Sequence, residues 1–266
     1  MTDQDAPVLT RFDPATGIGR LVLNRPAVLN AADATLAMGV REAVRYFAGV
    51  DGLRCLVLTG AGRAFMAGGD VASFAADPAQ TETVMHAILD AMNPAVLALR
   101  DLPAPILAAP HGVAAGAGFS LVLAADIVIA QAGTKFLMAY DRIGTVPDCG
   151  GSWFLPRKVG MGRAAEMMVL SHTLTAEQAQ DWGIVNRIAP ADGFAAAVDA
   201  LAAQLAQGPG RAFAAGRKLL DAAFGASLAE HLEAERNGFI AMTRTADFRE
   251  GTGAFLAKRP PAFTGR

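Results

Sequence analysis

Two glycine-rich stretches decide how this chain is interpreted: Gly60-Ala-Gly-Arg-Ala-Phe-Met-Ala-Gly-Gly-Asp70 and His111-Gly-Val-Ala-Ala-Gly-Ala-Gly-Phe-Ser120. The first follows a predicted strand and begins with Gly60-Ala-Gly62, so it must be compared with the dinucleotide-binding fingerprint. Phe65 occupies the place of the third glycine of that fingerprint. The sequence therefore argues against a nicotinamide-dependent dehydrogenase, and it also lacks the phosphate-binding Walker pattern.

The second stretch suggests another use of glycine, the close approach of backbone N–H groups to a ligand. Gly116-Ala-Gly118 precedes an apolar run that we predict to be a helix ending near Ala125. Free N–H groups and the helix dipole at such a start stabilise a developing oxyanion. A second donor from Gly68-Gly69 would complete a two-donor oxyanion hole. From these residues alone, tight turns and close helix–strand packing explain both stretches equally well.

Short apolar strands alternate with amphipathic helices on both sides of the glycine-rich stretches. The predicted strands are Ile18–Leu23, Leu53–Thr59, Ile106–Ala109 and Ile127–Ala130. Helical spacing of apolar residues covers Ala34–Ala48 and Glu82–Leu99, and Pro94 is a possible kink in the second helix. This alternation predicts an α/β fold with mostly parallel strands.

The second half of the chain is predicted to be mainly helical, with capping-box patterns that begin at Thr175 and Ser227. The predicted helices are Arg163–Ser171, Ala176–Trp182, Gly193–Gln207, Gly210–Ala223 and Leu228–Ala241. We divide the chain into a core, residues 1–190, and a helical C-terminal segment, residues 191–266. Helices that lack a core of their own bury their apolar face on another subunit, so this segment predicts a homo-oligomer.

Composition excludes several classes of protein. The chain has 266 residues, of which 53% are hydrophobic and 18% charged, a balance that is incompatible with intrinsic disorder. Its net charge of −2 argues against nucleic-acid and anionic-membrane partners. Two cysteines and four histidines show no metal-ligand spacing, so we expect no metal. Met1–Pro7 contains no apolar run and the most apolar stretch, 104–130, contains prolines and an aspartate, which together predict a cytoplasmic protein.

Several short motifs together resemble the enoyl-CoA hydratase/isomerase family, also called the crotonase family. They are Leu23-Asn-Arg-Pro26, Ala64-Phe-Met-Ala-Gly-Gly-Asp70, Pro105-Ile-Leu-Ala-Ala-Pro-His-Gly112, Ala125-Asp126 and Gly144-Thr-Val-Pro147. The resemblance runs from about residue 8 to the end of the chain, where Phe255-Leu-Ala-Lys-Arg259 also fits. Within the family, Pro147-Asp-Cys-Gly-Gly151 is most similar to the branch that isomerises ring epoxides of phenylacetyl-CoA.

The resemblance implies a spiral of ββα turns with a C-terminal helical trimerisation region, assembled as a trimer or a dimer of trimers. It implies an acyl-CoA substrate, with CoA as part of the thioester and no other cofactor. The backbone N–H groups of Gly69 and Ala117 would form the oxyanion hole. Arg25 and Lys258 would contact phosphates and Phe255 the adenosine, and Lys258 is a candidate contact for a neighbouring subunit's ligand. The implied CoA-thioester contacts are Arg25, Ala67, Gly69, Asp70, Val71, Ala72, Ala117, Phe255 and Lys258.

The carboxylates are where this chain departs from the family pattern. Family hydratases use two glutamates, and the corresponding positions here hold Ser120 and Tyr140. Asp148 stands where several family isomerases have a catalytic aspartate, although an aspartate just before a helix is also a common turn or capping residue. One carboxylate is sufficient for a 1,3-proton shift, because it can remove a proton from one carbon and return it to another.

We therefore predict an acyl-CoA isomerase with Asp148, Gly69 and Ala117 as its catalytic groups, acting on a double bond or on a ring epoxide. The alternatives are an enoyl-CoA hydratase and a non-catalytic acyl-CoA-binding member of the family. A third relative, the 4-chlorobenzoyl-CoA dehalogenase, also uses an aspartate at the Asp148 position but needs a histidine where this chain has Asn93. That substitution argues against dehalogenation.

Overall fold

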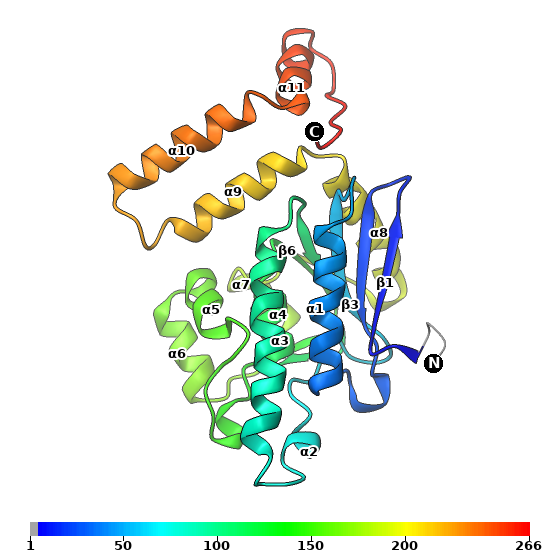
Figure 1. Ribbon diagram of the computed structural model, residues 1–266, viewed down its shortest axis with the longest axis vertical. Coiled ribbons are helices and arrows are strands. Elements are labelled where there is room, and N and C mark those ends of the chain that lie inside the picture. The colour runs from blue at the N-terminus through cyan, green and yellow to red at the C-terminus, as the bar shows by residue number, and fades with distance from the viewer. Residues whose placement is uncertain (1–4) are drawn as a thin grey trace.

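The main element of the computed structural model, which describes residues 5–266, is a six-stranded sheet (Figure 1). Its strand order is β1-β2-β3-β4-β6-β9. The strands are β1 (Val8–Asp13), β2 (Ile18–Leu23), β3 (Cys55–Gly60), β4 (Ile106–Ala108), β6 (Ile127–Gln131) and β9 (Arg187–Ala189). β1 runs antiparallel to β2 and all other neighbours are parallel, which confirms the predicted α/β architecture. Residues 1–4, part of the stretch used to argue against a signal peptide, lie outside the described residues.

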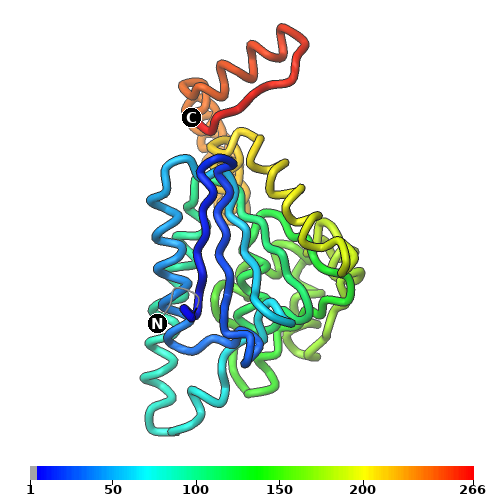
Figure 2. Tube along the Cα trace, turned by 90° about the vertical axis from the view of Figure 1, so that its right-hand side faces the viewer, coloured from blue at the N-terminus to red at the C-terminus, as the bar shows by residue number. Residues whose placement is uncertain are grey.

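Helices cover both faces of this sheet (Figure 2). α1 (Ala34–Ala48) and α3 (Thr81–Asp101) pack on one face, and α8 (Phe194–Ala206) packs on the other. α1 has the predicted bounds, because its apolar residues share one face and Asp33 caps its first turn by accepting from Leu36 N. Pro94 lies inside α3 without ending it. None of the helices in residues 5–266 is long and apolar enough to cross a membrane.

A second, three-stranded sheet stands beside the main one. It consists of β5 (Val113–Ala115), β7 (Lys135–Leu137) and β8 (Leu174–Thr175), in the order β5-β7-β8. β7 is parallel to β5 and antiparallel to β8. β5 leads directly into α4 (Ala117–Leu123), the apolar helix predicted after Gly116. The second sheet therefore positions the start of that helix.

The remaining helices are α2 (Val71–Phe74), α5 (Gly151–Val159), α6 (Met161–Val169), α7 (Ala176–Asp181), α9 (Gly210–Ala222), α10 (Leu228–Met242) and α11 (Ala246–Leu256). Of these, α6, α7, α9 and α10 agree with the predicted ranges to within a few residues, and both predicted capping boxes form. Single 3-10 turns lie at Pro26–Val28, Asp141–Ile143 and Ala191–Gly193. The sequence predicted neither α2, α5 nor α11.

The last three helices leave the core as a projecting arm (Figure 1), and we call residues 210–266 the C-terminal arm. The sequence divided the chain at residue 190, but α8 lies beyond that point and packs on the sheet of the core. Val198, Leu201 and Ala202 of α8 are buried against β3 and its neighbours, which places α8 with the core. The arm begins only at α9.

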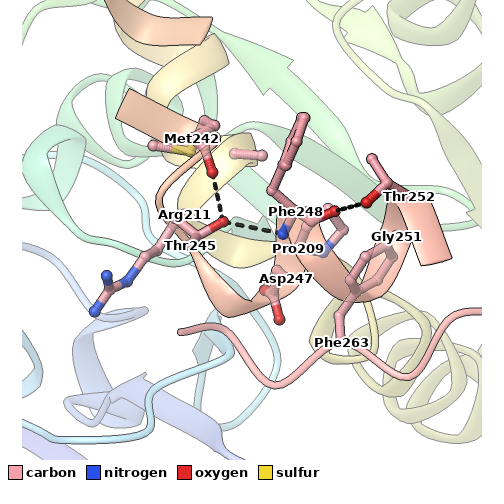
Figure 3. A pocket seen from close by; sticks show the side chains of 10 residues that line it. Pro209, Arg211, Met242, Thr245, Asp247, Phe248, Gly251, Thr252 and Phe263 are labelled. Atoms are coloured by element: carbon pink, nitrogen blue, oxygen red, sulfur yellow. Dashed lines mark hydrogen bonds between the residues drawn. The ribbon is translucent and has the colours of Figure 1, made fainter. Parts of the chain in front are cut away.

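The end of the chain folds back along the arm. Asp247 of α11 accepts the N–H groups of Thr264 (2.7 Å) and Gly265 (2.9 Å), and Arg54 of the core donates to the Phe263 carbonyl (3.1 Å). A cavity of about 250 Å³ remains between α9 and α11, with Phe248 and Phe263 among the side chains that line it (Figure 3). The tail thereby links α11 to the core.

Candidate active site

The two glycine-rich stretches meet in the structure. Met66 N donates to the Val113 carbonyl (3.1 Å), and Ala115 N donates to the Met66 carbonyl (2.9 Å). Gly68 (φ +101°) and Gly116 (φ +51°) both have left-handed backbone conformations that favour glycine. A Cβ added to Gly116 would lie 3.3 Å from Gly68 Cα. Close packing, which the sequence left as an alternative explanation, is thus present, and it places the two predicted donor loops side by side.

Both predicted oxyanion donors have unused N–H groups. Ala117 is the first residue of α4, so its N–H has no acceptor within the helix. Within residues 5–266, neither the Ala117 N–H nor the Gly69 N–H donates to a protein acceptor. Gly69 is exposed and Ala117 is buried at the head of the helix. Such a pair of free donors can stabilise the oxyanion of a thioester enolate. That Gly69 and Ala117 contact one substrate oxygen stays a prediction.

Asp148 is joined to these loops through hydroxyl groups. Tyr140 Oη donates to Asp148 Oδ1 at 2.5 Å, and Ser120 Oγ lies 3.3 Å from Tyr140 Oη. Ser120 Oγ also lies 3.3 Å from the Gly116 carbonyl oxygen. Ser120 and Tyr140, which the resemblance places where family hydratases have glutamates, therefore connect Asp148 to the loop that contains Gly116.

The alternative role of Asp148 was to cap the helix that follows it, and the structure tests this role directly. α5 begins after Gly150, and no side chain caps its first turn. The Asp148 side chain accepts from Tyr140 instead, while its main-chain carbonyl accepts from Gly151 N (2.9 Å). Left-handed conformations at Cys149 (φ +50°) and Gly150 (φ +81°) turn the chain between Asp148 and α5. The carboxylate is therefore not a helix cap.

Burial sets the protonation of the groups around Asp148. Desolvation raises the pKa of Tyr140 far above its usual range, and the negative charge of Asp148 raises it further. Tyr140 is consequently a neutral hydrogen-bond donor at physiological pH. Burial, followed by the charge of Asp148, also raises the pKa of the Cys149 thiol. A thiol that stays protonated is a poor nucleophile, so Cys149 is not a candidate for covalent chemistry.

The residues expected to border the thioester lie together beside the donor loops. Asp70 caps the short helix α2 by accepting from Ser73 N (3.2 Å), and Ala67 N donates to the Leu29 carbonyl (3.0 Å). Val71 and Ala72 are exposed on the surface of α2. This arrangement leaves one side of the loop open to a ligand.

Arg25 has a different environment from the one that a phosphate contact suggests. Its guanidinium lies 3.0 Å from Asp33, 3.1 Å from Asp70 and 2.6 Å from the Ala31 carbonyl. Two carboxylates therefore compensate its charge, and Arg25 connects the end of β2 to the loop that contains Gly69. Contact with a phosphate stays a prediction for this residue.

Phe255 and Lys258 are not brought to the site within one chain. Phe255 is 83% exposed on α11, and Lys258 follows that helix. α11 lies at the opposite end of the molecule from α2 in both Figure 1 and Figure 2. The ligand contacts of Phe255 and Lys258 therefore stay predictions, and they require a neighbouring subunit. Within the described part of the chain, no three histidine, cysteine, aspartate or glutamate side chains are grouped as metal ligands.

Comparison with known proteins assigns the chain and its fold to a class of enzymes. Residues 13–266 match the family model for enoyl-CoA hydratase/isomerase, so the chain belongs to this family, which acts on CoA thioesters. A solved structure, the putative enoyl-CoA hydratase/isomerase from Mycobacterium abscessus, superposes with a TM-score of 0.90 at 33% identity, covering 97% of this chain and 100% of the other. The expected crotonase fold is confirmed.

Individual relatives carry both kinds of activity in their names. The probable enoyl-CoA hydratase of Rhodobacter capsulatus is 41% identical over 256 residues, which are 96% of this chain and 98% of that protein. The 1,2-epoxyphenylacetyl-CoA isomerase of Escherichia coli is 39% identical over 251 residues, 94% of this chain and 96% of that protein. The 2,3-dehydroadipyl-CoA hydratase of Escherichia coli is 34% identical over 247 residues, 92% of this chain and 94% of that protein. The predicted similarity to a ring-epoxide isomerase is confirmed.

Proposed function

We propose that the chain is an acyl-CoA isomerase that shifts a double bond, or rearranges a ring epoxide, of a CoA thioester through an enolate. One observation carries the proposal. The Asp148 carboxylate is held by a hydrogen bond from Tyr140, whose hydroxyl lies 3.3 Å from that of Ser120. The family resemblance implies that Tyr140 and Ser120 stand at the two positions where family hydratases have glutamates. A site with one carboxylate suits proton transfer between two carbons better than the activation and addition of water.

The reaction needs only this chain's own groups. The thioester oxygen would accept the N–H groups of Gly69 and Ala117, which stabilise the charge that appears when a C–H proton leaves. Asp148 would take the proton from the α- or γ-carbon of the acyl group. The electron pair would move into the enolate, and the resulting carboxylic acid would return the proton to the other carbon. No atom is gained or lost in this double-bond shift.

The proposed ligand contacts are those that the family resemblance implies. CoA enters as part of the substrate, and the reaction uses no metal and no other cofactor. The assembly is a trimer or a dimer of trimers in the cytoplasm, in which α11 of one subunit approaches the ligand of a neighbour. The proposed contacts are Arg25, Ala67, Gly69, Asp70, Val71, Ala72, Ala117, Phe255 and Lys258.

A hydratase is the second candidate, because relatives at 41% and 34% identity are named as hydratases. In that reaction Asp148 would have to activate water and protonate the α-carbon without a second carboxylate. The buried hydroxyls of Ser120 and Tyr140 offer no base, because the pKa of Tyr140 is raised by burial.

Incubation with a 3-enoyl-CoA in heavy water separates these functions. The proposal predicts a conjugated 2-enoyl-CoA of unchanged oxygen content, with any incorporated deuterium at the α- or γ-carbon. A 3-hydroxyacyl-CoA product would establish the hydratase instead. If the protein binds the 3-enoyl-CoA without converting it, the same assay with a ring-epoxide thioester distinguishes a ring-specific isomerase from a binding protein.

A further inference from the structure

A continuous set of hydrogen-bonding groups joins the proposed base to the proposed oxyanion donor. It runs from Asp148 Oδ1 to Tyr140 Oη, then to Ser120 Oγ, and ends at the carbonyl oxygen of Gly116. That carbonyl and the Ala117 N–H belong to the same peptide group. We infer that Tyr140, supported by Ser120, is a positioning residue that fixes Asp148 relative to the oxyanion hole. The inference rests on the proposed function.

Tyr140 is well placed to orient the carboxylate. Its side chain is buried, and its Cζ lies 3.9 Å from the position that a Cβ on Gly116 would occupy. The ring is thus packed against the oxyanion loop while its hydroxyl holds Asp148. Tyr140 donates to Asp148 Oδ1, so this hydrogen bond fixes one carboxylate oxygen, and we assign the transferred proton to the other oxygen, Oδ2.

Tyr140 acts as a donor and not as a second base. Desolvation by burial raises its pKa, so its single proton remains on Oη and is directed at the Asp148 carboxylate. A hydrogen bond to a charged acceptor in a low-dielectric site is stronger than one between neutral groups. It therefore restricts the rotation of the carboxylate about its Cβ–Cγ bond.

Ser120 has a secondary role. Because the Tyr140 proton goes to Asp148, Ser120 has to donate to Tyr140 Oη or to the Gly116 carbonyl, each 3.3 Å away. With the first donation it strengthens the Tyr140 bond. With the second it polarises the peptide that bears the Ala117 N–H, alongside Ser120 N, which donates to the same oxygen at 3.0 Å. The single Ser120 hydroxyl proton cannot fully serve both acceptors. We therefore expect removal of the Ser120 hydroxyl to lower kcat less than removal of the Tyr140 hydroxyl does.

This network also explains how the site works without the family's two glutamates. Two neutral hydroxyl side chains occupy those positions, are buried, and leave Asp148 as the base. Replacing two carboxylates by hydroxyls removes the base for water and supplies an orienting donor for the remaining carboxylate. The presence of Ser120 and Tyr140 in place of two glutamates therefore accounts both for the loss of water addition and for the support of proton transfer by Asp148.

The test is Tyr140→Phe, which deletes only the hydroxyl. Removal of a hydrogen bond to a carboxylate in the transition state should lower kcat for 3-enoyl-CoA by about 10- to 100-fold. The dissociation constant of the acyl-CoA should stay within about twofold, because the inferred role of Tyr140 is to hold Asp148 and not to bind the ligand. Tyr46→Phe, at the chain's only other tyrosine, which is exposed, is the matched control and should retain full activity. Ser120→Ala should lower kcat by only about two- to fivefold.

A second comparison separates positioning from a merely structural role. In an Asp148→Asn background, Tyr140→Phe should cost no more than about twofold in the residual exchange of acyl C–H protons with heavy water, because its target is already gone. An equal loss in both backgrounds, or weaker acyl-CoA binding by Tyr140→Phe, overturns the inference. Should Tyr140→Phe fail to fold, Ser120→Ala in the two backgrounds provides the same test.

Failure of the inference is distinguishable from failure of the proposed function. If Asp148→Asn retains normal isomerase turnover, the proposed function is wrong. If Asp148→Asn is inactive and Tyr140→Phe is fully active, Asp148 is the base and only the positioning role of Tyr140 is excluded.

Discussion

Helices α4 and α10 show that the core and the C-terminal arm differ in how far their helices are buried within this chain. All seven residues of α4 are buried, whereas none of the fifteen residues of α10 is. α4 carries the Ala117 donor and is enclosed by its own chain. The C-terminal arm leaves large apolar side chains exposed, including Leu228 (75%) and Leu256 (81%). The helix that carries the proposed donor is thus enclosed within one chain, while the arm leaves an apolar surface exposed, and we expect another subunit to cover that surface.

The core and the C-terminal arm meet at a network of ion pairs. Arg217 of α9 donates to Asp126 Oδ2 (2.8 Å), and Arg100 of α3 binds both Asp126 (3.0 Å) and Asp221 of α9 (2.8 Å). Arg217 is nearly inaccessible, and burial lowers its pKa, an effect that the neighbouring Asp126 opposes. The network fastens the arm to the sheet, because Asp126 also accepts from Ile106 N of β4 (2.9 Å).

The largest effect on stability is expected from Asp126→Asn. It leaves the buried Arg217 without its nearest counter-charge, and breaking such a pair costs about 3–5 kcal/mol of the free energy of unfolding. Urea denaturation measures the change. Asp199→Asn, which removes an exposed pair with Arg20, is the control and should cost no more than about 1 kcal/mol. Equal losses would show that the Asp126 network stabilises the fold no more than an exposed ion pair does.

Removal of one oxyanion donor should have the next largest effect. Ala117→Pro deletes the N–H at the first position of α4, where helices tolerate proline. Loss of one such donor should lower kcat by about 10²–10³. Ala34→Pro makes the same change at the first position of α1, after the extended residue Asp33, and should leave kcat unchanged. Equal activity of the two variants would exclude Ala117 from the oxyanion hole.

Polar substitutions in the arm should affect assembly and not the core. Each exposed leucine that is covered by a neighbour contributes about 1.5–3 kcal/mol, so Leu228→Glu with Leu256→Glu should raise the subunit dissociation constant at least about tenfold. Sedimentation velocity over a range of protein concentrations measures this shift. Leu97→Glu, at an exposed leucine of α3, is the matched control. A double variant that sediments like the unmodified protein would contradict the role of the arm.

The smallest effect concerns the two thiols. Burial raises the pKa of Cys55 to about 12 and also raises that of Cys149, so neither thiol should react with iodoacetamide at pH 8 until the protein is unfolded in urea. The folded state holds the Cys55 proton more tightly than the unfolded state, whose thiol has a pKa near 9. Stability should therefore fall as pH rises from about 9 to about 12. Mass spectrometry counts the alkylated thiols, and labelling of the folded protein would contradict their burial.

Several of the longer elements were predictable from local pattern, although β1, α5 and α11 were missed. β2 and α1 have the predicted bounds because each is long enough for its apolar residues to show a period. β5, β7 and β8 have two or three residues each and show no period, so the sequence did not indicate the second sheet. The division at residue 190 rested on where strands end, and it could not show that α8 packs back on the core.

The sequence predicted which residues belong to the candidate site, but it did not predict the hydrogen bonds and ion pairs that those residues make. The sequence marked Ser120, Tyr140 and Asp148 by comparison with the family pattern, but their hydrogen bonds depend on left-handed turns at Gly144 and Cys149. The pairing of Asp126 with Arg217 joins residues 91 positions apart and has no local signal. Arg25 was identified by its motif, and only the structure shows that two carboxylates surround it.

The central claim is that Asp148 transfers the proton. The most direct measurement compares Asp148→Asn with the unmodified protein for conversion of a 3-enoyl-CoA, together with the acyl-CoA dissociation constant of each. The account predicts that the asparagine variant binds acyl-CoA with unchanged affinity and loses turnover by at least about 10³-fold, because an amide cannot accept the proton. Near-normal turnover by a variant that binds equally well would contradict it.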